Sequence, residues 1–204
     1  MYTARIHHLA LMLCLLFATS CSNSKNPRSQ HKVFNETYPL PSGWFRAGAS
    51  PYRFAMGTDK GAGMDGGNAA TIKSITTPNG FGTLMQNCRP DNYLGKRIKL
   101  SGYMKTKDVN QWAGFWLRVD DSSGRRSSAF DNMSNRPIRG TTNWTKYELV
   151  LDVSANATNI AFGALLDNSG QIWFDKLSLE VVSNTTPTTD KMPQTEPQNM
   201  NFEN

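Results

Sequence analysis

The sequence predicts an all-β protein, an antiparallel two-sheet β-sandwich, and three observations support this. Between about Val33 and Val182, about nine short runs alternate apolar and polar residues, as half-buried strands do. Clusters of Gly, Asn, Asp and Ser, such as residues 121–124 and 167–170, separate these runs as turns. No apolar pattern is long enough for the helix of a parallel crossover, so we expect the strands to pair antiparallel.

Each expected strand is a run in which side chains alternate between two faces. The expected strands cover residues 52–56, 70–74, 82–88, 97–105, 111–120, 128–133, 146–152, 159–166 and 171–182. Apolar residues share one face of several of these strands, for example Ile98, Leu100 and Met104, and Leu149 and Leu151. We assign these faces to the core.

The strand at residues 111–120 carries two different faces. Alternation places the apolar set Ala113, Phe115, Leu117 and Val119 toward the core, and the set Trp112, Gly114, Trp116 and Arg118 on the other side. Two indoles beside a guanidinium offer flat apolar surface and directed donors, which suits polyols and sugars. The alternative is that both tryptophans are core residues of the sandwich, the commoner role of Trp.

Three further residues are candidates for the same site. Asp131 and Asn132 follow the tryptophan strand and could supply an acceptor and an amide beside Arg118. The alternative for Asp131 is a structural ion pair with Arg118 or Arg136. Trp44 could stack on a sugar at the mouth of the domain, or seal the end of the sandwich.

The N-terminal 21 residues predict an export signal. A basic start, an apolar stretch from Leu9 to Ala18 and small residues before Cys21 form this pattern, which is too short for a permanent membrane span. The pattern resembles the lipobox of bacterial lipoproteins, which implies lipidation of Cys21 and, with Ser22 next, sorting to the outer membrane. The alternative is an ordinary cleaved leader.

The segments on either side of the sandwich are polar and lack apolar spacing. We expect residues 22–33 to form a flexible tether and residues 183–204 to form a disordered tail. The sandwich itself is then expected over residues 34–182.

Composition excludes several classes of function. The net charge of +6 is modest and scattered, without the basic stripe of a nucleic-acid surface, so we expect no nucleic-acid partner. The three histidines, His7, His8 and His31, all precede the expected sandwich, which disfavours Ser-His-Asp and Cys-His catalysis and zinc sites. Cys88 is left without a cysteine partner and is expected to be a buried small residue.

Several segments, in their order, resemble a known module. The segments are residues 34–36, 43–45, 66–69, 100–103 and 172–179. Together they are similar to a jelly-roll domain of the carbohydrate-binding, galactose-binding-like type. The resemblance implies a jelly-roll sandwich that binds saccharide, often with a structural calcium ion. Its calcium ligands would be Glu36 and Asp175, with the turn at residues 65–68. The alternative for these acids is that they cap surface turns.

Three functions from different classes remain. The first is an envelope-anchored, non-catalytic binding module for carbohydrate or glycan. The second is a structural or partner-binding lipoprotein of the envelope without sugar affinity. The third is a carboxylate-dependent glycan-active enzyme, which would need two acids facing each other across a cleft. Among Asp120, Asp121, Asp131 and Glu148 the sequence forces no such pair, so we expect no catalytic activity.

Overall fold

The computed structural model describes residues 37–122 and 127–190, and the rest of the chain lies outside the described residues. The described chain is almost entirely β-structure, with one short 3-10 helix, η1 (Pro51–Arg53). The strands are β1 (Phe45–Gly48), β2 (Phe54–Asp59), β3 (Ala69–Ser74), β4 (Phe81–Cys88), β5 (Arg97–Asp121), β6 (Ala129–Asp131), β7 (Ile138–Asp152), β8 (Ala157–Asp167) and β9 (Gln171–Val182). None of the described segments is a helix that could cross a membrane.

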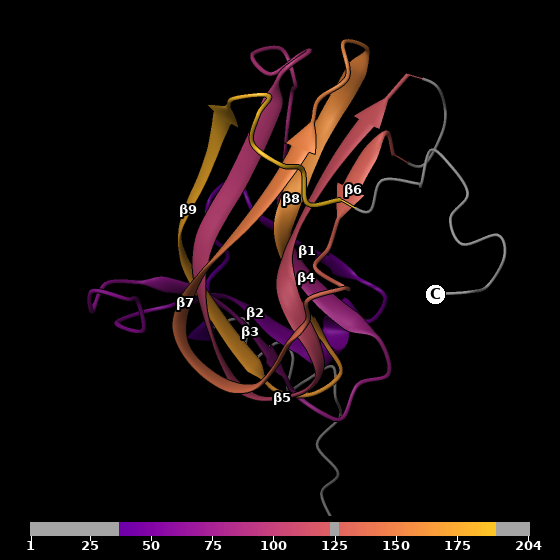
Figure 1. The fold of residues 1–204 in the computed structure, drawn as a ribbon. Coiled ribbons are helices and arrows are strands. Elements are labelled where there is room, and N and C mark those ends of the chain that lie inside the picture. The colour runs from indigo at the N-terminus through magenta and orange to yellow at the C-terminus, as the bar shows by residue number, and fades with distance from the viewer. Residues whose placement is uncertain (1–36, 123–126, 191–204) are drawn as a thin grey trace, which may run out of the picture.

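Two layers form because β5 takes part in both of them (Figure 1). The first half of β5 pairs with β7 and β9, and β9 continues through β3 to β2. The second half pairs with β6 and β8, and β8 continues through β4 to β1. Every pairing is antiparallel, so the predicted antiparallel β-sandwich is confirmed.

The bend in β5 joins two strands that the sequence predicted as separate, residues 97–105 and 111–120. Its pairing with β7 shifts register three times between Met104 and Ala113, which marks a series of bulges. Asp108, inside this region, has a φ of 53°, a conformation that bends the backbone sharply. The bend carries one continuous strand from one layer to the other.

The core lies between the layers and is filled by the side chains that alternation assigned to it. Ala113, Phe115, Leu117 and Val119 on β5 are fully buried. Phe115 meets Phe174 of β9 edge to face across the layers, with ring centroids 6.0 Å apart. Fully burying one such side chain contributes about 1.5–3 kcal/mol. The alternation therefore fixes which face of β5 points outward.

The C-terminal segment differs from the sequence prediction. Residues 183–190 were expected to belong to a disordered tail, and this is wrong, because the segment covers the open edge of β7. Thr189 donates its backbone N–H to the carbonyl of Val150 (2.9 Å) and accepts the N–H of Val150 on Oγ1 (2.8 Å). Arg97 holds the segment further up by donating to the carbonyls of Asn184 and Thr186. The segment thus gives hydrogen-bond partners to backbone groups at the edge of β7, and unpaired backbone groups would be unfavourable there.

Candidate functional site

The outward face of the layer β1-β4-β8-β5-β6 carries the candidate site. In an ordinary antiparallel layer this face is polar, because one side packs on the core and the other meets water. Here register brings apolar and aromatic residues together across the strands. Trp116 of β5 lies opposite Gly163 of β8, which lies opposite Met85 of β4. Two residues further along each strand and on the same face, Leu165 of β8 lies opposite Thr83 of β4.

These outward residues form a second apolar cluster, separate from the main core. Met85, Trp116, Ala161 and Leu165 are its buried members, and Ala47 and Trp112 pack against them. A sheet that buries apolar side chains on both faces without a third layer to cover one of them offers that face to a ligand or a partner.

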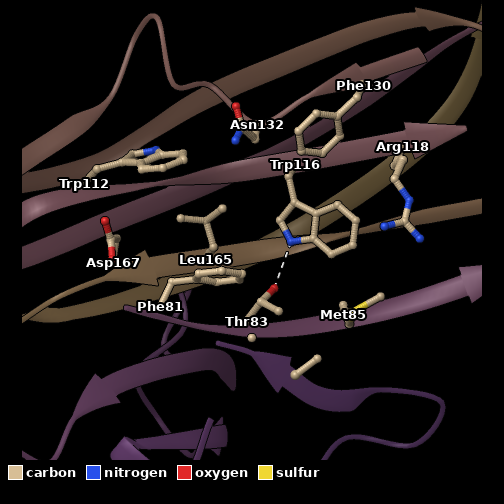
Figure 2. Close-up of a pocket in the computed structure, with 12 residues that line it drawn as sticks. Phe81, Thr83, Met85, Trp112, Trp116, Arg118, Phe130, Asn132, Leu165 and Asp167 are labelled. Atoms are coloured by element: carbon tan, nitrogen blue, oxygen red, sulfur yellow. Dashed lines mark hydrogen bonds between the residues drawn. The ribbon is translucent and has the colours of Figure 1, made fainter. Parts of the chain in front are cut away.

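The cluster surrounds a pocket of about 410 Å³, a size typical of sites for small ligands (Figure 2). The residues around it come from five strands and the turn after β6. They are Ala47, Gly48, Phe81, Thr83, Met85, Trp112, Trp116, Arg118, Phe130, Asn132, Leu165 and Asp167. The predicted residues Trp112, Trp116, Arg118 and Asn132 therefore lie around one cavity.

Trp116 forms the floor of this pocket. Its side chain crosses from β5 over β8 to β4, where Nε1–H donates to Oγ1 of Thr83 at 2.8 Å (Figure 2). Thr83 in turn donates to the carbonyl of Ala164 at 2.7 Å. Gly163, which lies opposite Trp116 on β8, has no side chain, and β4 approaches it closely. Trp116 is only 7% exposed, so its orientation is fixed before any ligand arrives.

Trp112 lies along the side of the pocket and is half-buried. Gly114 separates it from Trp116, and this residue has no side chain to fill the gap between the rings. The structure fills that gap with Met133: a Cβ at Gly114 would lie 3.1 Å from the Cβ of Met133. Within the described residues, the buried Nε1 of Trp112 has no hydrogen-bond partner. The two indoles therefore differ, one fixed by a hydrogen bond and one held by packing alone.

Arg118 stands at one end of the pocket with its charge already compensated. Its Nε lies 2.9 Å from Oδ1 of Asp120, and its Nη2 donates to Oδ2 of the same carboxylate at 3.1 Å. Asn159 also donates to that carboxylate, at 3.0 Å. The guanidinium is held in one orientation, and because Asp120 balances its charge, it suits a hydroxyl or carbonyl better than a second carboxylate.

Asp131 and Asn132 have different roles: Asp131 is the last residue of β6, and Asn132 begins the turn that follows it. Asp131 is buried and bonds Arg136 at 2.6 Å, and it also accepts the N–H of Met133 at 2.8 Å. The interpretation of Asp131 as a structural ion pair with Arg136 thus holds, although its edge also touches a smaller, separate cavity. Asn132 lines the main pocket and accepts the N–H of Ser134 on its carbonyl oxygen.

The remaining tryptophans lie elsewhere. Trp44 does not line the pocket; its ring packs on Phe162 and Phe174, with centroids 6.2 and 5.9 Å away. This packing agrees with the alternative that Trp44 seals the end of the sandwich, and its contact with a ligand stays a prediction. Trp144 and Trp173 flank the ammonium of Lys105 in the other layer, at 5.0 and 4.8 Å.

Sequence reasoning missed the part of the pocket that β4, β6 and β8 supply. Phe81, Phe130 and Asp167 line it together with Met85 and Leu165. Each stands in a strand with ordinary alternation, so nothing local marks it. Only the pairing of β5 with β8, and of β8 with β4, brings these residues beside the tryptophans.

The predicted calcium site is only partly described. Glu36 lies outside the described residues, so its role stays a prediction. Asp175 accepts the N–H of Met64 at 3.1 Å and that of Lys176 at 2.7 Å, and Lys176 forms an ion pair with Asp65. In the described part of the chain, no three His, Cys, Asp or Glu side chains gather as metal ligands. A rise in Tm on adding calcium, absent in Glu36→Gln, would test the site.

Cys88 is half-buried, less than the buried position that the sequence predicted. It packs against the main core, and burial raises the pKa of its thiol. A raised pKa reduces the thiolate fraction and with it the reactivity. Cys21, the expected lipidation site, lies outside the described residues.

The fold, a two-layer antiparallel β-sandwich, is similar to that of several solved structures. The xylan-binding domain from CBM 22 matches 70% of this chain and 89% of its own, with a TM-score of 0.50 and 11% identity. The enzymatically active domain of tailspike protein 4 from Bacteriophage CBA120 matches 69% of this chain and 20% of its own, with a TM-score of 0.51 and 15% identity. At such low identity these likenesses show the fold alone.

A relative in sequence comes from Bacillus subtilis (strain 168). It is named as the uncharacterized HTH-type transcriptional regulator YbfP, and it is 43% identical over 167 residues. The match covers 79% of this chain and 56% of that protein, so the chain spans little more than half the length of this relative. None of the models of protein families matches the chain.

Proposed function

We propose that this protein is a non-catalytic carbohydrate-binding module whose ligand lies in the pocket of Trp112 and Trp116. The observation that carries the proposal is the pocket itself, which opens on the outward face of a sheet and has two indoles along it. A flat apolar surface of this kind matches the apolar face of a sugar ring.

The polar groups around the pocket suit a hydroxylated ligand. Arg118 offers guanidinium N–H donors, while Asn132 offers an amide and Asp167 a carboxylate. Because Asp120 compensates Arg118, this end does not favour an anionic group. A small number of directed polar groups among apolar walls is the usual composition of a site that orients a ligand.

The likeness to a xylan-binding domain supports the same class of function at the level of the fold. One fold can carry many different functions, so the pocket is the main support for carbohydrate binding. Xylan binding is a property of that domain. The pocket residues of this chain determine which ligand it binds.

The carboxylates of the described chain argue against a two-acid glycosidase. Among the described residues that line the pocket, Asp167 is the one carboxylate. Asp120 and Asp131 each pair with an arginine, and Glu148 pairs with Lys146 in the other layer. Glycoside hydrolysis normally needs two acids across the scissile bond.

The proposal places the module at the cell envelope, on the basis of the N-terminal sequence. The apolar stretch and Cys21 form a lipobox-like signal, and acyl chains would hold the module at the outer membrane. Incorporation of labelled palmitate, lost in Cys21→Ser, would support the anchor. Unchanged membrane fractionation of that variant would count against it.

A second candidate is a sensor or partner-binding module without affinity for polysaccharide. The similarity to YbfP favours it, because the name of that protein describes a helix-turn-helix regulator. The residues that the structure describes form strands and one short 3-10 helix, with no helix-turn-helix among them. Capture of a protein partner that free sugars do not displace would favour this candidate.

Glycan-array screening followed by calorimetric titration tests the proposal. Trp112→Ala should lose most of the affinity, because it removes one wall of the pocket. Trp144→Ala is the matched control, since Trp144 lies in the other layer. Binding that Trp144→Ala weakens more than Trp112→Ala, or no binding of any glycan, would refute the proposal.

A further inference from the structure

Asp167 lies between two aromatic residues at the end of the pocket opposite Arg118. It pairs with Trp112 of β5 on one side and with Phe81 of β4 on the other, so the three form one row across three strands. Side chains paired in this way stand about 4.5–5.5 Å apart. All three line the pocket (Figure 2), and Asp167 is half-buried there.

The carboxylate of Asp167 has no counter-charge in the part of the chain that the structure describes. Within residues 37–122 and 127–190, no ion pair or side-chain hydrogen bond holds it, whereas Asp120 and Asp131 are each paired with an arginine. Arg139 donates instead to the carbonyl of Gln111, at 2.7 Å. Among the residues described around the pocket, Asp167 therefore leaves one negative charge uncompensated.

A carboxylate flanked by aromatic rings attracts a cation in two ways. The carboxylate forms a charge-assisted hydrogen bond with an ammonium, and the faces of Trp and Phe rings attract the same positive charge. A neutral hydroxyl gains only the weaker hydrogen bond. Resting on the proposed function, we infer that the Asp167 end binds a protonated primary amine, so the preferred saccharides are amino sugars with free amino groups.

The length of the site fixes where the amine belongs on the ligand. Trp112, paired with Asp167, and Arg118 are six residues apart on β5, which corresponds to about 20 Å at about 3.4 Å per residue. Trp116 lies between them. A saccharide of several units thus places its amine beside Asp167, a ring on Trp116 and hydroxyl groups near Arg118.

The test compares two saccharides with the same backbone, a glucosamine hexamer and its fully N-acetylated form, by calorimetry at mildly acidic pH and low salt. The wild-type protein should bind the free amine about tenfold or more tightly, the usual gain of a charged hydrogen bond. Raising the salt concentration should shrink that preference. The comparison needs no variant, so a failure to fold cannot obscure it.

Asp167→Asn should bring the ratio of the two affinities, free amine over acetylated form, close to one. Asp91→Asn is the control, because Asp91 is an exposed acid outside the pocket. Equal affinity of the wild-type protein for both hexamers, or a preference that survives Asp167→Asn, would overturn this inference and leave the proposed function standing. Absence of binding to every saccharide would instead overturn the proposed function.

Discussion

Gly163→Ala tests how closely β4 and β8 must approach beneath the pocket. A Cβ at this position would lie 2.3 Å from the carbonyl oxygen of Leu84, and 2.9 Å from both Cα and Cβ of Met85. These neighbours are backbone or next to it, so no side-chain rotation relieves the clash. The two strands have to separate, which also disturbs the surface on which Trp116 lies.

Overpacking of this kind costs about 1–3 kcal/mol. For a domain of this size, a loss of about 2 kcal/mol lowers Tm by roughly 4–8 °C. Thermal unfolding followed by circular dichroism measures the shift, and titration with the ligand should show weaker binding, because the floor of the pocket moves.

Gly67→Ala is the matched control for this change. A Cβ at Gly67 meets nothing within 4 Å, so its Tm should stay close to that of the wild-type protein. A Tm of Gly163→Ala within about 1 °C of both would refute the packing that we describe between β4 and β8.

Two further predictions concern the indoles and acid pH. Trp116→Phe loses the hydrogen bond to Thr83, whereas Trp112→Phe removes an N–H that has no partner among the described residues. Chemical denaturation should therefore show Trp116→Phe less stable than Trp112→Phe by about 1 kcal/mol, and equal losses would contradict this. The hydrogen bond from Arg97 holds the pKa of Asp152 below its ordinary value, so the pair stabilises the fold fully above that value and loses its effect as pH falls through the lowered one. The pair is partly exposed, so Asp152→Asn should lower the free energy of unfolding by less than about 1 kcal/mol at neutral pH. At strongly acidic pH it should have no effect. A loss of stability that grows as the pH falls would contradict the assignment.

The alternation of apolar and polar residues predicted those features of the fold that the structure confirms. Period-two alternation along β5 separates Phe115 and Leu117 from Trp112, Trp116 and Arg118 without any knowledge of pairing. It therefore predicted both the sandwich and the face on which the pocket lies. The same rule could not predict the bend in β5, because bulges interrupt the alternation that it depends on.

Pairing between distant strands decided the rest of the site. Asp167 is an ordinary residue before a turn until register places it between Trp112 and Phe81. The position of Trp44 depends on distant elements in the same way: only the packing of the layers shows that its ring faces Phe162 and Phe174, outside the pocket. The type of a residue suggests what it could do in a site, but the pairing and packing of distant strands decide whether it lies there.

The C-terminal segment shows a second limit of composition. Residues 183–190 are polar, which suggested disorder. Polar residues also serve to satisfy a strand edge, and Thr189 does this for Val150 with two hydrogen bonds. An exposed strand edge is a property of the assembled sheet, so the composition of the tail could not reveal it.

The indole N–H signals of the five tryptophans, followed by NMR during titration with a bound saccharide, test the central claim most directly. The signals of Trp112 and Trp116 should shift as the ligand is added, and those of Trp44, Trp144 and Trp173 should stay in place. Shifts confined to Trp144 and Trp173, on the other layer, would show that the ligand does not bind in this pocket.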